Sequence, residues 1–346
     1  MNAELNVHND AQDRDAQSRV SILLSTYNGE KYLREQVESI QKQTYTNWHL
    51  FIRDDGSRDA TPYIIAELAE NDERITWINP HERENLGVVG SFQALLAHAT
   101  ADFYLFSDQD DYWLEDKVAT QVSRALAHAA ECGRRGVVEP YMNYMDPVVV
   151  DAQLNTLTPS MIRSQSGHAN TTLVEELTEN TVTGGVSLIN DALAQLWLGG
   201  GASSSADASA IMMHDWFLAL LATAHGTLEF IDQQGELYRQ HEANVLGART
   251  FSKRVAQLSR PDLLVRKYWT LIHRSQKQAA LVLENRYGGE ELTEEKRELI
   301  RAFVTIENLP WRERARVLKR YNLRKNKRLM TLAFRVLLIT GWGKRW

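Results

Sequence analysis

Apolar runs and helical patterns alternate along the first 130 residues of the chain. Four short apolar runs predict buried strands, and each is followed by apolar residues three or four positions apart, which predicts a helix. The predicted strands cover residues 20–24, 49–52, 75–78 and 103–106, and the helices after them carry Leu33, Val37 and Ile40, then Ile64, Ile65 and Leu68, then Phe92, Leu95 and Leu96, and lastly Val118, Val122 and Leu126. Strand–helix units of this length predict an α/β fold, a mostly parallel sheet with helices on both faces.

The pattern changes after residue 135 and divides the chain. Further strands are predicted at residues 148–150 and 185–189, and the Gly/Ser segment 199–205 is predicted to be a mobile loop. The first residues are polar and lack periodicity, which predicts disorder. The expected organisation is a disordered N-terminus (1–18), an α/β domain (19–250), a helical C-terminal region (251–310) and a tail (311–346).

Polar residues follow three of the predicted strands at the point where each strand ends. They form the segments 25–29, 54–57 and 108–111. Ligands of open parallel sheets bind outside the carboxyl ends of the strands. These segments are therefore expected to line one binding site, although 54–57 alone could be only a turn between a strand and a helix.

The third segment holds three carboxylates in four positions, Asp108, Asp110 and Asp111. Crowded carboxylates repel one another unless a cation lies between them. Mg²⁺ and Mn²⁺ prefer oxygen ligands, and Mg²⁺ commonly completes its shell with substrate phosphates. The cluster therefore predicts a site for a divalent metal and a diphosphate; the alternative is a solvated acidic turn that caps the next helix.

The charge of the chain is distributed unevenly. Twelve Lys and Arg against Glu313 alone give residues 311–346 a charge of +11, so the other 310 residues carry −17 of the total of −6. The tail also holds Trp311, Trp342 and Trp346 beside an apolar stretch too short to span a bilayer. We expect an amphipathic helix lying on an anionic membrane surface. A solvated helix face or an oligomer contact is the alternative, and the acidic remainder argues against nucleic acid as a partner.

The cellular compartment follows from two weaker observations. Cys132 is the single cysteine, so no intrachain disulfide can form, which suits a reducing cytoplasm. The N-terminus is too polar for a secretory signal. We expect a cytoplasmic protein held peripherally at the inner face of the inner membrane.

Six short motifs occur in an order that resembles a known family. They are Thr26-Tyr27-Asn28-Gly29, Asp54-Asp55-Gly56-Ser57-x-Asp59, Asn85-x-Gly87, Asp108 to Asp111 with Trp113, His214-Asp215-Trp216, and Tyr238-Arg239-Gln240-His241. Together they resemble the family 2 glycosyltransferases, inverting enzymes of the Rossmann-like GT-A fold, and in particular the rhamnosyltransferases of bacterial surface-polysaccharide and O-antigen synthesis. The resemblance covers roughly residues 19–247 and leaves the C-terminal region uncovered.

The resemblance implies roles for individual residues. Tyr27 and Asp55 correspond to the pair that holds the nucleotide base, and Asp108 to the aspartate near the ribose. Asp110 and His241 correspond to metal ligands, and Asp215 to the catalytic base. Nucleotide-sugar contacts are also expected from Thr26, Asn28, Asp54, Asn85, Gly87 and Gln109, and acceptor-side contacts from Gly184, Gly185, His214 and Trp216.

The chemistry of glycosyl transfer needs the same kinds of group. Charge develops on the departing diphosphate, and a divalent cation stabilises it. A carboxylate must take the proton of the attacking hydroxyl. The expected function is transfer of L-rhamnose or a related deoxyhexose from a dTDP-sugar, or a UDP-sugar, to a lipid-linked glycan. Alternatives are a sugar nucleotidyltransferase and a non-catalytic, membrane-tethered glycan-binding subunit.

Overall fold

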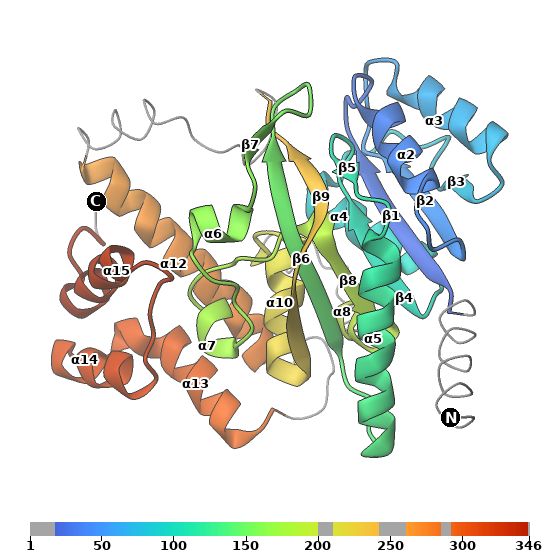
Figure 1. The fold of residues 1–346 in the computed structure, drawn as a ribbon. Coiled ribbons are helices and arrows are strands. Elements are labelled where there is room, and N and C mark those ends of the chain that lie inside the picture. Colours follow the sequence, from blue (N-terminus) through green and yellow to red (C-terminus); the bar gives the residue numbers. More distant parts are fainter. Residues whose placement is uncertain (1–17, 200–209, 242–260, 285–291, 345–346) are drawn as a thin grey trace.

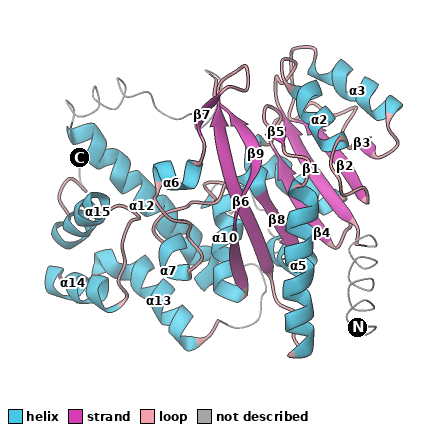
Figure 2. Cartoon of the chain, in the orientation of Figure 1, coloured by secondary structure: helices cyan, strands magenta, loops and turns pink. Residues whose placement is uncertain are grey.

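The computed structural model describes residues 18–199, 210–241, 261–284 and 292–344. Its first part is a run of strand–helix units, and all four predicted strands and their helices are present (Figures 1 and 2). The strands are β1 (Val20–Thr26), β2 (Trp48–Asp54), β3 (Ile75–Trp77) and β4 (Phe103–Ser107), and the helices are α2 (Leu33–Gln41), α3 (Thr61–Asn71), α4 (Gly87–His98) and α5 (Lys117–Arg134). The strands lie in the order β3-β2-β1-β4, and all three pairings are parallel. The predicted α/β fold is confirmed.

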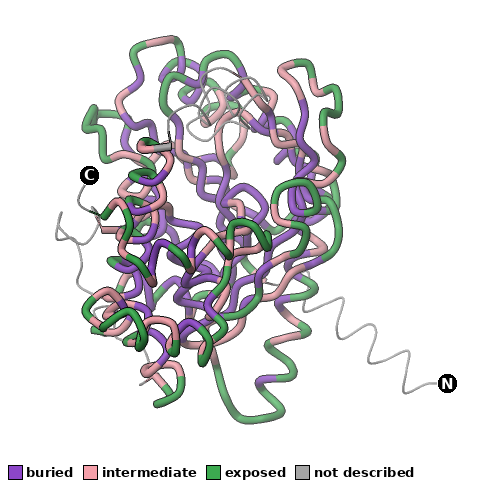
Figure 3. Tube along the Cα trace, turned by 90° about the vertical axis from the view of Figure 1, so that its left-hand side faces the viewer, coloured by how far each residue is buried: buried purple, intermediate pink, exposed green. Residues whose placement is uncertain are grey.

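Alternate residues of β1 belong to two separate hydrophobic cores. Ile22 and Leu24 pack in one cluster with Val37 of α2 and Val122 of α5. Leu23 packs in the other, which continues through α4 to the C-terminal helices. Successive side chains of a strand point to opposite faces of the sheet, so the two clusters lie on its two sides. Buried residues fill the interior and exposed residues the periphery (Figure 3).

The sheet continues beyond β4 with strands of mixed direction. After β4 the order continues with β8 (Ser187–Asn190), then β6 (Tyr141–Val150), β9 (Thr227–Arg239) and, at the edge, β5 (Tyr112–Trp113). The short strand β7 (Thr156–Thr158) pairs with β6. Only the last three residues of β6 were predicted from the sequence, because polar residues interrupt its apolar pattern. Both polar side chains are paired: Asn143 with Gln121, and Asp146 with Ser160. The strand predicted at 185–189 begins instead as a 3₁₀ turn, η1 (Gly184–Val186).

The C-terminal part is helical, as the sequence predicts. It comprises α12 (Pro261–Leu283), α13 (Glu294–Thr305), η2 (Ile306–Asn308), α14 (Trp311–Arg320) and α15 (Arg328–Thr340). The prediction of a single helix in the tail is wrong, since α14 and α15 are separate helices. Both pack onto the domain, where Leu318 and Phe334 share a cluster with Phe217 of α10 (His214–His225). Among the described residues, no helix combines the length and apolar character needed to cross a membrane.

Two of the sequence predictions concern residues that are not described. The predicted disordered segment ends at residue 18, which is its single described residue. The predicted Gly/Ser loop begins at Gly199, the last residue of α8 (Asp191–Gly199), and its other residues lie outside the described ranges.

Candidate active site

The carboxyl ends of β1, β2 and β4 meet at one edge of the sheet. Thr26 at the end of β1 is in register with Asp54 at the end of β2, and the amide of Asp55 donates to the carbonyl oxygen of Thr26 at 2.8 Å. The three polar segments predicted from the sequence are therefore neighbours. Parallel pairing produces this arrangement, because it places every strand end on the same side.

Gln109 joins the acidic segment to the end of β1. Its Oε1 accepts hydrogen bonds from Thr26 Oγ1 at 2.5 Å and from the amide of Tyr27 at 2.8 Å. Its Nε2 donates to the carbonyl oxygen of Tyr27 at 3.1 Å. These bonds fix the backbone of Tyr27, whose side chain is 47% exposed. A ring held in this way can stack on a flat ligand.

Asp54 and Asp55 are buried and have different partners. The Asp54 carboxylate accepts from both the amide and the hydroxyl of Ser57, so it shapes the turn. The Asp55 carboxylate accepts from Arg53 and from the amides of Leu86 and Gly87, which begin α4. A carboxylate has about four acceptor positions. Asp55 therefore keeps about one for a ligand.

Asn28 and Asn85 support the same loops. Asn28 has a left-handed backbone conformation, with φ of 51°, and its Oδ1 accepts from the amide of Arg58 at 2.9 Å. Asn85 Nδ2 donates to the carbonyl oxygen of Asp55 at 2.8 Å. Both side chains connect the loop after β2 to its neighbours.

Asp110 and His241, the two residues predicted as metal ligands, contact each other. Asp110 Oδ2 lies 2.7 Å from His241 Nε2, although 131 positions separate the residues in the chain. Arg239, at the end of β9, holds this region together. Its amide donates to Asp111 Oδ1 and its Nε to the carbonyl oxygen of Asp110, each at 2.8 Å.

The acidic edge brings several carboxyl groups close enough together to affect one another's charge. Burial, together with the neighbouring charges of Asp110 and Glu236, raises the pKa of Asp108 to about 8. Burial also raises the pKa of Asp111 well above its usual value. A bound divalent cation favours ionised carboxylates. Carboxylate oxygens together with an imidazole nitrogen are suitable ligands for Mn²⁺ or Mg²⁺, so these residues fit such an ion.

Asp215 lies in the first turn of α10, close enough to the cluster for its charge to raise the pKa of Asp108. Its Oδ1 accepts from the amide of Trp216 at 2.6 Å, and its Oδ2 from the amide of Gly184 at 3.1 Å. Burial raises the pKa of Asp215 to about 6. At neutral pH the group is mainly ionised and is a stronger base than an ordinary aspartate, which suits proton abstraction.

Of the four residues predicted on the acceptor side, His214 and Trp216 have buried side chains. The His214 ring packs against Phe92 and Phe106, with centroids 4.2 and 5.0 Å away, and neither of its nitrogens has a hydrogen-bond partner among the described residues. Burial lowers its pKa to about 3, so the ring is neutral. Trp216 Nε1 donates to the carbonyl oxygen of Glu176 at 2.7 Å. Their burial makes both side chains supports of α10 rather than a surface open to an acceptor.

Three residues of the site were not predicted as functional residues from the sequence. Lys117 and Glu236 form a buried ion pair behind the acidic edge, and Arg239 binds the backbone of that edge. Lys117 reads in the sequence as an ordinary exposed residue at a helix start. Arg239 belongs to the motif Tyr238-Arg239-Gln240-His241, so its position close to His241 in the sequence could have indicated a place in the site.

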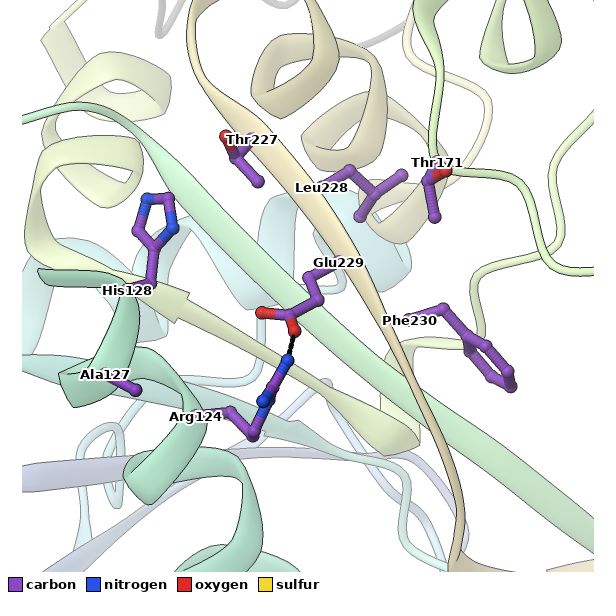
Figure 4. Close-up of a pocket in the computed structure, with 8 residues that line it drawn as sticks. All are labelled: Arg124, Ala127, His128, Thr171, Thr227, Leu228, Glu229 and Phe230. Atoms are coloured by element: carbon purple, nitrogen blue, oxygen red, sulfur yellow. Dashed lines mark hydrogen bonds and ion pairs between the residues drawn. The ribbon is translucent and has the colours of Figure 1, made fainter. Parts of the chain in front are cut away.

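An open hollow of about 550 Å³ lies at the other end of β9 (Figure 4). Arg124 of α5 and Glu229 of β9 face each other across it and form an ion pair. Nearby, His128, Cys132 and Glu139 bring three potential metal-ligand atoms within 4.8 Å of one another. The Arg135 guanidinium donates to the Cys132 sulfur, which disfavours a cation there. The strand ends therefore remain the candidate active site.

Comparisons with known proteins identify the family of the chain. The profile of Glycosyl transferase family 2 matches residues 21–157. The dTDP-rhamnosyl transferase RfbG of Shigella flexneri is 30% identical over 251 residues, which cover 71% of this chain and 80% of that protein. The UDP-Glc:alpha-D-GlcNAc-diphosphoundecaprenol beta-1,3-glucosyltransferase WfgD of Escherichia coli is 35% identical over 107 residues, 31% of this chain and 41% of that protein.

A solved structure supports the fold alone. The S. aureus TarS 1-349 structure in complex with UDP has a TM-score of 0.50 and 14% identity, and the match covers 94% of this chain and 87% of that one. The GT-A architecture expected from the resemblance is thus present. The similarity to RfbG extends well beyond the matched profile and includes most of both chains. The chain belongs to glycosyl transferase family 2 and is a glycosyltransferase.

Proposed function

We propose that this glycosyltransferase moves L-rhamnose, or a related deoxyhexose, from a dTDP-sugar to a hydroxyl group of a lipid-linked glycan, with inversion at the anomeric carbon. The observation that carries the proposal is the contact between Asp110 and His241 beside the strand ends, with Asp215 of α10 close enough for its charge to raise the pKa of Asp108. The similarity to a dTDP-rhamnosyl transferase over 80% of that protein supports the choice of donor. A UDP-sugar is the second candidate, because uracil and thymine present the same hydrogen-bonding edge.

In this proposal the nucleotide lies on the ends of β1 and β2. The exposed ring of Tyr27 stacks on the base, and the remaining acceptor position of Asp55 takes a hydrogen bond from it. Asp108 faces the ribose. Gln109 holds the Tyr27 backbone in place, and Thr26, Asn28, Asp54, Asn85 and Gly87 shape the loops around the base.

Asp110 and His241 would hold a divalent cation, Mg²⁺ or Mn²⁺. Such an ion, when bound, stabilises the charge that develops on the departing diphosphate. The two side chains already lie 2.7 Å apart, so they need little rearrangement to share an ion. Arg239 keeps their backbone segments together.

Asp215 takes the proton of the attacking acceptor hydroxyl. The amides of Gly184 and Trp216 hold its carboxylate in one orientation, while burial raises its proton affinity. A single base on the face opposite the leaving group matches direct displacement, whereas the two-carboxylate pair of glycoside hydrolases serves a different reaction. Gly184 and Gly185 contribute backbone on the acceptor side.

A donor panel tests the proposal. Purified protein is incubated with dTDP-, UDP- and GDP-sugars and Mn²⁺, and release of the nucleoside diphosphate is followed, first with water and then with a lipid-linked glycan as acceptor. We expect release from dTDP-L-rhamnose to exceed release from the other donors. Preferential use of a GDP-sugar would contradict the donor assignment, and equal release in EDTA would contradict the metal.

We also propose that α15 binds the inner face of the inner membrane and brings the site to its acceptor. One face of this helix, with Phe334, Leu337 and Leu338, is buried in the domain. The opposite face carries Leu329, Leu332 and Val336, which are 73%, 61% and 43% exposed. The same C-terminal segment carries twelve basic residues and the exposed side chains of Trp311 and Trp342. Apolar burial and attraction to anionic lipid would act together there.

A further inference from the structure

Lys117 is a buried cation that takes no direct part in the proposed reaction. It begins α5, and its side chain has no exposed surface. Its ammonium nitrogen lies 3.5 Å from Glu236 Oε2 and 3.3 Å from the centroid of the Trp113 ring. It also donates a hydrogen bond to the carbonyl oxygen of Gly185. Burial of an ion is unfavourable unless close partners compensate for the lost water, so Lys117 depends on these three contacts to stay charged.

The backbone that Lys117 contacts belongs to a tightly enclosed turn, η1. A Cβ atom on Gly185 would come within 2.6 Å of Glu236 Oε2. On the other side of the turn, a Cβ atom on Gly184 would come within 2.6 Å of His214 Nε2. Glycine is needed at both positions because there is no room for a methyl group. The turn is therefore confined between the buried ion pair and the buried imidazole.

The same turn is hydrogen-bonded to Asp215. The amide of Gly184 donates to Asp215 Oδ2 at 3.1 Å, and Ser187 Oγ donates back to the carbonyl oxygen of Gly184 at 2.7 Å. A continuous path thus leads from the Lys117 ammonium through the Gly185 carbonyl and the Gly184 amide to the carboxylate. A base must be held within a narrow range of positions to act efficiently.

We propose that Lys117 and Glu236 are positioning residues for Asp215. Glu236 fixes the Lys117 side chain, Lys117 fixes the Gly184–Gly185 turn, and the turn directs the Asp215 carboxylate. Neither residue of the pair touches the substrate. The inference rests on the proposed function, in which Asp215 is the catalytic base.

The alternative is a pair that contributes to folding alone. Lys117→Met leaves Glu236 buried without its partner, which destabilises a protein strongly. The double variant Lys117→Met/Glu236→Gln removes both charges, so it avoids that penalty and still lacks the hydrogen bond to Gly185. Lys296→Met is the matched control. The Lys296 ammonium also donates to a backbone carbonyl, that of Ala224 at 2.8 Å, but at the opposite end of α10.

The experiment measures kcat, KM for dTDP-L-rhamnose and the pH profile of kcat with Mn²⁺, together with thermal stability. For the double variant we expect kcat to fall about 10- to 100-fold with KM changed less than about twofold. The acid limb of the profile should move to higher pH, because an ionised Asp215 that loses the Gly184 amide is less stabilised. Lys296→Met should leave kcat, KM and the pH profile unchanged. Wild-type kcat and an unmoved profile in the double variant would overturn the proposal.

Hydrogen exchange measured by mass spectrometry decides the same question without substrate. In the double variant, exchange of the Gly184 amide should accelerate at least about tenfold, the measure of a loosened hydrogen bond, while exchange in β1 stays as in the wild type. Uniform acceleration, or none, would show a purely structural pair and overturn the inference. If the wild type uses none of the sugar nucleotides, the proposed function fails, and exchange at Gly184 still reports whether the pair fixes the turn.

Discussion

Replacement of Asp215 by asparagine separates proton transfer from binding. Asp215→Asn keeps the size of the side chain and an oxygen for the Trp216 amide, but it cannot accept the proton of the acceptor. We expect the rate constant at saturation to fall at least ~100-fold, the usual scale for loss of a general base. Binding of dTDP should change little, because the residues proposed to hold the nucleotide lie at the carboxyl ends of β1, β2 and β4 and at the start of α4, not on α10.

The raised pKa of Asp215 fixes the pH dependence of the wild type. The carboxyl group must be ionised to act as a base, and its pKa of about 6 means that the rate falls as the pH drops through 6. At pH 5 about one molecule in ten has the ionised form, so kcat should be about tenfold lower than at pH 8. This limb should be absent from the residual activity of Asp215→Asn.

The same shift predicts the effect of the substitution on stability. Folding raises the pKa of Asp215 from 3.8 to about 6, so the folded state binds this proton more tightly than the unfolded state does. The group therefore costs stability as the pH rises from about 4 to 6, in total roughly 3 kcal/mol at 1.36 kcal/mol per pKa unit. Asparagine removes this cost and loses one hydrogen bond, worth about 1 kcal/mol. Asp215→Asn should be no less stable than the wild type at pH 8.

Single-turnover kinetics, dTDP calorimetry and urea unfolding are the measurements. Asp191→Asn is the control, because Asp191 also occupies the first turn of a helix, α8, where it accepts from Tyr104 away from the site. This variant should keep the wild-type rate. Lost dTDP binding together with an intact chemical step in Asp215→Asn would refute the role assigned to Asp215.

Three further predictions follow from other parts of the structure. Asp110→Ala should abolish turnover, and EDTA should do so in the wild type until Mn²⁺ or Mg²⁺ is added; full activity in EDTA would exclude metal dependence. Gly185→Ala should lower kcat about 100-fold, because the methyl group would lie 2.6 Å from the Glu236 carboxylate, and wild-type kinetics would show that the turn can yield. Leu329→Ser/Leu332→Ser should release the protein from anionic vesicles in a flotation assay without loss of activity on a soluble acceptor analogue, and binding of the wild type should weaken with salt. If the wild type fails to float at low salt, the membrane role is wrong.

The parallel half of the fold was predictable because its information is local. Each strand is a short apolar run, each helix after it has a clear apolar stripe, and the polar segments stand where the strands end. Parallel pairing then brings these segments together without further information. The positions of Thr26, Asp54 and Asp108 at one edge could therefore be expected from the sequence.

The rest of the site depends on contacts between distant parts of the chain. Lys117 and Glu236 are 119 positions apart, and each alone has the character of a surface residue. The two side chains are buried because β9, which carries Glu236, lies between β5 and β6 in the sheet. Neither strand pairing produces a periodic pattern in the sequence from which this burial could be predicted. His214 shows the converse. It stands in a recognisable motif, but the motif does not reveal that its ring points into the core between Phe92 and Phe106.

The packing of α14 and α15 also determines how the membrane proposal can be tested. The sequence suggests that deletion of residues 311–346 removes a dispensable tail, because the motifs end near residue 247. In the structure five apolar side chains of that segment are buried in the same cluster as the core of α10, namely Leu318, Leu323, Phe334, Leu337 and Leu338. Burial of such side chains is worth roughly 1.5–3 kcal/mol each, so their loss approaches the whole stability of a typical domain, about 5–15 kcal/mol. A truncated protein would lose activity by unfolding whether or not it binds membranes. Substitution of the exposed residues Leu329 and Leu332 leaves these contacts intact and is therefore the test that separates membrane binding from folding.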